Sequence, residues 1–138
     1  MTNRLFLKFP AKAENVQVAR VAVATFAASG EFTLGDVEDI KIAVQEAVSN
    51  AVLHAYGNGT GEVEVEATLD GRGDLTVIVR DNGKGIDDLK RAREPGFSTL
   101  EEHMGLGFSF MEAFMDSLWV ESSPGRGTTV RMLKKRCP

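Results

Sequence analysis

Apolar and polar positions change their period along the chain, and each change marks a predicted element. Residues 4–9 alternate between apolar and polar side chains and predict a short strand that ends at Pro10. Residues 11–28 are rich in Ala and Val and predict a helix. This helix is apolar around most of its circumference, so we expect it either to lie between two layers or to offer one face to a partner.

A second helix is predicted up to about Tyr56. In residues 42–56 apolar side chains recur at intervals of three and four, which places one face of the helix against a core. Residues 33–36 (Thr-Leu-Gly-Asp) form an N-cap pattern, and the acidic first turn suits the positive end of the helix dipole. The glycine-rich residues 57–61 end the helix.

Further along the chain, apolar and polar residues alternate strictly in two pairs of segments, and each pair predicts a hairpin. Residues 62–69 and 74–80 alternate on either side of an Asp-Gly-Arg-Gly turn. Residues 117–121 and 128–133 repeat the pattern around a loop that contains Pro and Gly. Each hairpin is expected to have one buried face and one solvated face, with the two preceding helices over the buried face of the first.

The segment of about residues 86–104 is irregular, and a loop of this length inside a compact domain is usually a functional lid or a disordered segment. A third helix is expected to open at Gly105-Leu106-Gly107 and to run to about Met115. The resulting order of elements predicts an α/β (α+β) two-layer sandwich, with a mostly antiparallel sheet covered by helices on one face. The length of 138 residues predicts a single domain over residues 1–138.

Composition and charge narrow the class of protein. Hydrophobic residues make up 43% and charged residues 26%, which is typical of a soluble globular protein. The net charge of −4 gives no general attraction to nucleic acid or anionic lipid, and no apolar run reaches the roughly 18 residues of a membrane span. Because Cys137 is the single cysteine and the N-terminus does not resemble a signal peptide, the cytoplasm is the expected location.

The first candidate site lies on the second helix. Glu46, Asn50 and His54 are each four residues apart and so share one stripe of a regular helix. A carboxylate and an amide one turn apart are well placed to hold a metal-bound ligand, and an amide oxygen suits Mg²⁺. The stripe alone is more typical of a helix with a solvated polar edge.

A second candidate site lies at the end of a predicted strand. Asp81 is followed by Gly83 and Gly85, which let the backbone approach a ligand closely. Its carboxylate can accept a hydrogen bond from an exocyclic amine, such as that of adenine. An ordinary turn is the alternative interpretation.

Two further motifs offer hydrogen-bond donors, one from the backbone and one from a hydroxyl group. Gly105 and Gly107 are expected to place N–H groups at a helix N-terminus, where phosphate is stabilised. Thr128 follows Gly127 and offers a hydroxyl at the start of the last strand, where glycine permits a close approach.

The order of these motifs resembles the ATP site of the GHKL superfamily, which has the Bergerat fold. Over nearly its whole length the chain is similar to the bacterial anti-sigma-factor serine kinases, most closely to the sporulation type, with the stress-response type as the near alternative. The similarity is carried by residues 14–21, 46–56, 80–86, 107–121 and 127–130.

The resemblance implies ATP or ADP and Mg²⁺ as ligands of a GHKL kinase domain. Glu46 matches the catalytic general base that acts on a serine hydroxyl, Asn50 matches the Mg²⁺ ligand, and Asp81 matches the residue that reads adenine. The implied nucleotide-binding positions are Asn50, Asp81, Gly83, Gly85, Gly105, Gly107 and Thr128.

The resemblance also implies protein partners. Its members are homodimers that bind a sigma factor and phosphorylate an anti-anti-sigma factor on serine, with no direct contact to nucleic acid or membrane. Arg20 matches an arginine that contacts both protein partners. The residues alone favour an arginine whose stem lies along the helix edge.

One departure from the family pattern concerns the lid. Members usually carry an arginine shortly before the Gly-x-Gly motif that contacts the γ-phosphate, and residues 100–104 lack it. A positioned cation of this kind can change the rate of phosphoryl transfer by a factor of ~10³ or more. The candidate substitutes are Lys84, Lys90, Arg91, Arg93 and a protonated His103.

This departure leaves a second function open, namely a nucleotide-gated anti-sigma protein with little kinase activity. A third, a histidine-kinase-like module that acts on histidine, is disfavoured by the chain length.

Overall fold

The computed structural model describes residues 2–55, 61–83 and 100–136, and for residues 54, 55 and 100–105 it describes the backbone alone. Within this part, five strands form one antiparallel sheet in the order β1-β2-β3-β5-β4. Their bounds are Asn3–Pro10 for β1, Glu62–Leu69 for β2, Leu75–Asp81 for β3, Ser117–Ser123 for β4 and Gly127–Lys134 for β5.

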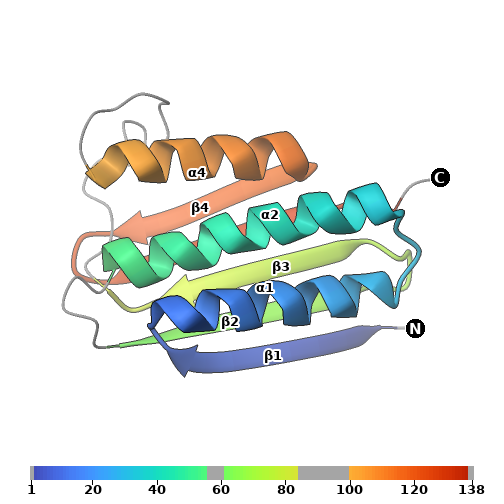
Figure 1. Cartoon of the computed structure of the whole chain (residues 1–138), viewed down its shortest axis with the longest axis horizontal. Helices are drawn as coiled ribbons and strands as arrows, with labels where there is room; N and C mark the ends of the chain where they lie inside the picture. Colours follow the sequence, from blue (N-terminus) through green and yellow to red (C-terminus); the bar gives the residue numbers. More distant parts are fainter. Residues whose placement is uncertain (1, 56–60, 84–99, 137–138) are drawn as a thin grey trace.

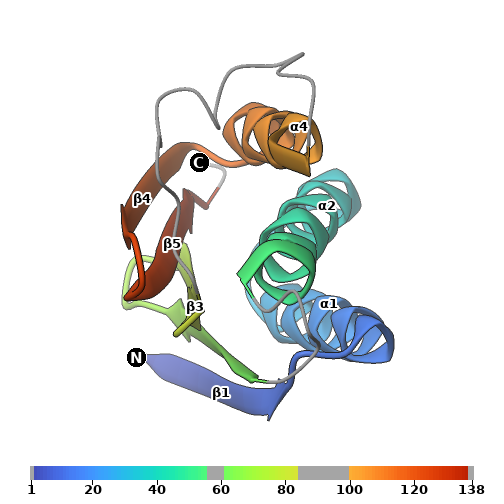
Figure 2. The same cartoon turned by 90° about the vertical axis from the view of Figure 1, so that its left-hand side faces the viewer.

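Helices cover one face of this sheet, as Figures 1 and 2 show. They are α1 (Ala13–Ala28), α2 (Leu34–Asn50) and α4 (Leu100–Phe114), and a π-helical turn, η1 (Ala51–Ala55), extends α2. This arrangement confirms the predicted two-layer sandwich. None of the helices in the described residues is long and apolar enough to cross a membrane.

The core fills the space between the two layers. Buried and partly exposed residues alternate strictly along β2 and β3, as predicted, because successive side chains of a strand point to opposite faces. From the helices, Ile40 of α2 and Phe108 and Met111 of α4 are fully buried against the sheet.

The two N-terminal helices follow their predicted signals. Thr33 caps α2 in a reciprocal pair with Asp36, in which the Asp36 N–H donates to Thr33 Oγ1 at 3.0 Å and the Thr33 N–H donates to Asp36 Oδ2 at 3.1 Å. Helix α1 buries a face of small residues, while Val18 and Val21 stay exposed. Of the two environments predicted for this helix, the one with a free face is therefore found.

Helix α4 differs from its prediction, because it begins at Leu100 and not at Gly105. Residues 100–104 hold no helix breaker, and a glycine inside a helix costs only about 1 kcal/mol relative to Ala, so Gly105 does not stop it. The prediction that Gly105 and Gly107 lie at a helix N-terminus is wrong. Residues 100–104 of the predicted lid are helical, and the rest of that lid, residues 86–99, lies outside the described residues.

The end of α2 differs as well. From Ala51 the backbone widens into the π-helical turn η1, a feature that is frequent at functional sites. Since the spacing of an α-helix stops at Asn50, the predicted stripe holds for Glu46 and Asn50 and does not extend regularly to His54. The side chain of His54 is outside the description.

Candidate active site

Glu46 and Asn50 lie one turn apart near the end of α2, and Gly107 of α4 packs against both. A Cβ at Gly107 would lie 3.1 Å from Asn50 Nδ2 and 3.2 Å from Glu46 Oε2. These distances are tighter than ordinary contacts, so hydrogen is the substituent that fits there without moving the pair. Gly107 therefore lets the α4 backbone approach the carboxylate and the amide, a role that its expected place at a helix start would not give it.

Burial affects both side chains of the pair, Glu46 and Asn50, in ways that cost stability. Burial raises the pKa of Glu46 above its ordinary value. Asn50 Nδ2 is buried and has no hydrogen-bond partner among the described residues. A buried polar atom without a partner costs about 1–3 kcal/mol, so this amide nitrogen is arranged for an acceptor that the described residues do not supply.

Asp81 forms a second cluster with the first residues of β5. It is the last residue of β3, is only 8% exposed and lies opposite Thr128 in the sheet register. Its Oδ1 accepts a hydrogen bond from the Gly83 N–H at 2.9 Å. Burial raises the pKa of Asp81, and the backbone N–H groups of Gly83 and Thr128, which favour the carboxylate, oppose that rise.

The close approach of β5 to Asp81 depends on Gly127. This residue has φ +90°, in the left-handed region, and a Cβ there would lie 2.1 Å from the carbonyl oxygen of Asp81. The close approach that the structure shows at this glycine is to the backbone of Asp81 and Asn82.

Ser122 belongs to the same cluster and was not identified from the sequence. Its Oγ lies 2.8 Å from Thr128 Oγ1 and donates to the Gly127 carbonyl oxygen at 3.1 Å. The register of the β4–β5 hairpin places Ser122 opposite Thr128, so a correct pairing of the two strands is the signal that would have found it.

The two clusters lie at the same end of the molecule. Helix α2 ends, β3 ends and β5 begins on the left in Figure 1, and α4 starts there. Asp81 is buried in alternation with Val77 and Val79, so it faces the helical layer. The structure therefore brings Glu46 and Asn50 to the same end, and the same side of the sheet, as Asp81.

Other predicted site residues are placed less fully. Gly85 and the lid cations Lys84, Lys90, Arg91 and Arg93 lie outside the described residues, and of His103 and Gly105 the backbone in α4 is described. Arg20 lies on α1, where it contacts α2 through Gln45.

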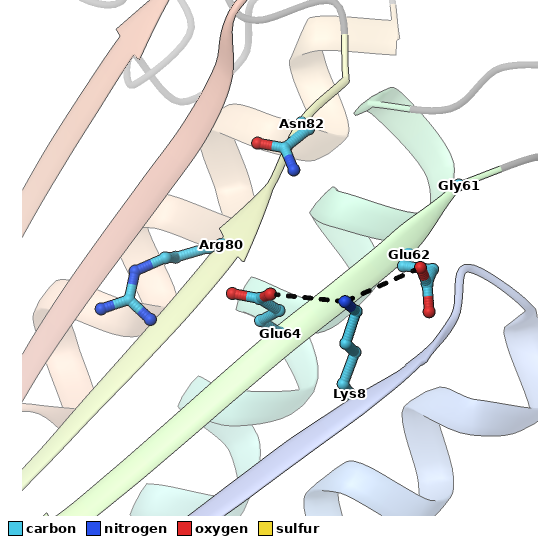
Figure 3. A pocket seen from close by; sticks show the side chains of 6 residues that line it. All are labelled: Lys8, Gly61, Glu62, Glu64, Arg80 and Asn82. Atoms are coloured by element: carbon cyan, nitrogen blue, oxygen red, sulfur yellow. Dashed lines mark ion pairs between the residues drawn. The ribbon is translucent and has the colours of Figure 1, made fainter.

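A pocket of about 280 Å³ opens on the opposite face of the sheet (Figure 3). Lys8 Nζ lies there 3.9 Å from Glu62 Oε1 and 4.0 Å from Glu64 Oε1, so opposite charges meet within the pocket. Arg80 and Asn82, which flank Asp81 in the chain, line this pocket, so it lies on the other face of the sheet from the candidate site.

The burial of Glu46 predicts a stability effect that depends on pH. Because its pKa is raised in the folded state, the protonated form stabilises the fold at low pH, and this contribution is lost as the pH rises through the raised pKa. We expect Glu46→Gln, which stays neutral, to raise the Tm of the nucleotide-free protein near pH 7. The gain should shrink as the pH falls to the ordinary carboxyl range, and thermal unfolding from pH 8 to 4 measures it. A Tm difference that is the same at every pH would contradict this origin.

The chain is similar to known proteins over nearly its whole length. Residues 9–134 match a model of the histidine kinase-like ATPase domain. The chain is 46% identical to an anti-sigma F factor of Thermoanaerobacter sp. (strain X514), over 96% of this chain and 94% of that protein. It is 44% identical to an anti-sigma F factor of Clostridium acetobutylicum, over 98% of this chain and 95% of that protein.

Solved structures show the same fold. The RsbU and RsbW domains of a Mycobacterium tuberculosis protein match with a TM-score of 0.71 at 22% identity, over 96% of this chain and 32% of that one. The histidine kinase domain of a blue-light activated histidine kinase from Erythrobacter litoralis matches with a TM-score of 0.61 at 20% identity, over 93% of this chain and 62% of that one.

A family of ATPase domains implies a nucleotide site, and the two polar clusters lie where the ends of α2 and β3 meet the start of β5. The family match covers most of the chain, and the anti-sigma F factors match over nearly all of it. The chain therefore belongs to the histidine kinase-like ATPase domain family, in the group that contains the anti-sigma F factors.

Proposed function

We propose that this chain is an ATP-dependent protein serine kinase and an anti-sigma factor. It binds and inhibits a sporulation-type sigma factor and phosphorylates an anti-anti-sigma factor on serine, as a cytoplasmic homodimer. The observation that carries the kinase part is the half-buried Glu46 carboxylate beside the amide nitrogen of Asn50, which has no partner among the described residues. The names of the relatives support the sigma factor as partner.

Glu46 is the general base in this proposal. Its carboxylate takes the proton of the serine hydroxyl as the serine oxygen bonds to the γ-phosphorus of ATP, and the bond from that phosphorus to the bridging oxygen breaks to release ADP. Burial raises the pKa of Glu46, which makes its carboxylate a stronger base than an ordinary glutamate. Gly107 has no side chain to displace the Glu46 carboxylate, which a Cβ there would approach to 3.2 Å.

Asp81 reads the adenine ring. The N–H groups of Gly83 and Thr128 hold its carboxylate in place, and its remaining lone pairs can accept from the exocyclic amine of adenine. The low exposure of Asp81 strengthens such a bond, because water competes with it less.

The donor set also fits Mg²⁺. Mg²⁺ takes oxygen ligands together with substrate phosphates, and the Asn50 side chain offers one such oxygen, Oδ1. The buried Nδ2, which has no partner in the described part of the chain, is a donor that can bond to a phosphate oxygen. When bound, Mg²⁺ would supply positive charge to the phosphate oxygens during transfer. Asn50 is the residue that we assign to hold it.

Incubation with an anti-anti-sigma protein and Mg²⁺-ATP tests this function. We expect both partners to be encoded next to this chain, and we expect acid-stable phosphoserine on the anti-anti-sigma protein. A protein that binds the sigma factor in a nucleotide-dependent way without forming phosphoserine would instead be the gated binding protein with little kinase activity. Acid-labile phosphate on the partner would overturn the serine kinase in favour of transfer to histidine.

Arg20→Ala is expected to weaken capture of the sigma factor by roughly 1–3 kcal/mol, because Arg is frequent among the residues that dominate binding energy at interfaces. Titration of labelled sigma factor with ATP present measures the change. An unaltered sigma affinity would show that Arg20 only joins the two helices.

A further inference from the structure

Arg20 is held by neutral acceptors on two helices. Its Nη1 donates to Gln45 Oε1 at 2.6 Å, across from α1 to α2, and its Nη2 donates to Gln17 Oε1 one turn earlier on α1. Among the residues that the structure describes, no carboxylate pairs with Arg20. The guanidinium is therefore fixed in position while its positive charge is not neutralised.

The hydrogen bonds of this guanidinium are also incomplete. Arg20 Nε is buried and has no acceptor in the described part of the chain. A guanidinium carries five N–H donors in a rigid fork, and a carboxylate is the acceptor that matches this fork. Because Nε is closed to solvent, a partner's carboxylate would bond to the N–H groups of Nη1 and Nη2 that the glutamines leave over. It would meet a charge that α1 and α2 have already positioned.

Apolar side chains border this cation. Val21 is 47% exposed and lies four residues after Gln17 on α1, and Ile42 is 38% exposed and lies three residues before Gln45 on α2. Residues at these spacings share a helix face, so Val21 and Ile42 extend the surface on which Gln17 and Gln45 lie. An acidic side chain next to apolar side chains is the partner chemistry that fits this surface.

We propose that Gln17 and Gln45 are positioning residues for partner capture, which hold Arg20 through uncharged amides so that its full charge faces the partner. The inference rests on the proposed function, in which Arg20 contacts the sigma factor and the anti-anti-sigma factor. Beyond that function, we expect the affinity for these partners to depend on the two acceptors, the side chains of Gln17 and Gln45, being uncharged.

The alternative is that the two glutamines only fasten α1 to α2. Gln45→Glu separates the two roles, because it keeps the shape and the acceptor but adds a negative charge beside Arg20. If Gln45 only links the two helices, Gln45→Glu should strengthen that link, since hydrogen bonds between charged groups are roughly twice as strong as neutral ones. If Gln45 positions an uncompensated Arg20, Gln45→Glu should weaken binding of the sigma factor, because the added carboxylate neutralises the charge that the partner needs.

The experiment measures the affinity of Gln45→Glu and Gln17→Glu for the neighbouring-gene sigma factor with ATP present, with Tm and ATP affinity in parallel. Ala113→Glu is the control, because it adds the same charge at an exposed position of another helix, α4. We expect each glutamine variant to lose at least tenfold in sigma affinity and ATP affinity to stay within twofold, while the control loses less than threefold. Gln17 is exposed, so Gln17→Glu tests the role of a neutral acceptor even if Gln45→Glu perturbs folding.

Two results would overturn the inference, and they differ. Glutamine variants that bind the sigma factor as tightly as the unchanged protein, while Arg20→Ala binds weakly, would reduce Gln17 and Gln45 to helix packing and leave the proposed function intact. Unchanged binding by Arg20→Ala as well would remove Arg20 from the interface, and both the inference and that part of the proposed function would fall.

Discussion

Glu46→Gln is expected to lower the rate of phosphoryl transfer to serine by about 10²–10⁴-fold while leaving ATP affinity nearly unchanged. Glutamine fills the same space against Gly107 and Asn50 but cannot take the proton of the serine hydroxyl. The interaction that it removes is needed in the transition state and not for nucleotide binding, so the loss belongs in kcat. Single-turnover transfer at saturating ATP, with a separate ATP titration, measures both quantities.

The expected stability of this variant serves as its own control. Because burial raises the pKa of Glu46, the glutamine variant should be at least as stable as the unchanged protein near pH 7, so unfolding cannot explain a lost rate. Parallel losses of transfer rate and ATP affinity would argue that Glu46 helps to bind the nucleotide and is not the base.

The second large effect is expected at Gly127. An alanine there would adopt φ +90° and would place its Cβ 2.1 Å from the Asp81 carbonyl oxygen, so β5 would have to move away from β3 at the Asp81–Thr128 pair. We expect Gly127→Ala to lower the free energy of unfolding by more than the roughly 1–3 kcal/mol of backbone strain alone. ATP affinity should fall at least tenfold, because the displaced pair includes the carboxylate assigned to adenine.

Gly125→Ala is the matched control for this substitution. Gly125 also has a positive φ, +76°, but a Cβ there would have nothing within 4 Å. It should therefore show the backbone strain without the clash and keep its ATP affinity. Urea unfolding and ATP titration of both variants measure the difference, and equal effects on the two variants would refute the role of the Gly127–Asp81 contact.

Local signals predicted most of the fold. The alternation in residues 62–69 and 75–81 produced strands with the predicted buried faces, and Thr33 with Asp36 marked the start of α2. These features depend on side-chain period and capping, which are properties of neighbouring residues. The start of α4 was missed because two glycines were taken as a boundary that the surrounding helix formers override.

The site was predictable in its residue types but not in its contacts. Glu46, Asn50 and Asp81 carry recognisable chemistry, and the structure places them at one end of the molecule. Gly107 against Glu46, Ser122 beside Thr128 and Gln45 beneath Arg20 are contacts between distant segments, which depend on packing and strand register. The π-helical turn after Asn50 likewise has no signal in the apolar period of its helix.

Titration of the unchanged protein with ATP and with GTP tests the central claim, an adenine nucleotide site in which Asp81 reads the base. Adenine offers an amine where guanine offers a carbonyl oxygen, and a carboxylate accepts from the first and repels the second. We predict at least about 100-fold tighter binding of ATP, because sites built around one hydrogen-bonding group discriminate strongly against analogues without it. In Asp81→Asn the ratio should shrink, since the amide N–H₂ can face the ligand. Equal affinity of the unchanged protein for ATP and GTP, or no binding of ATP, would contradict the account.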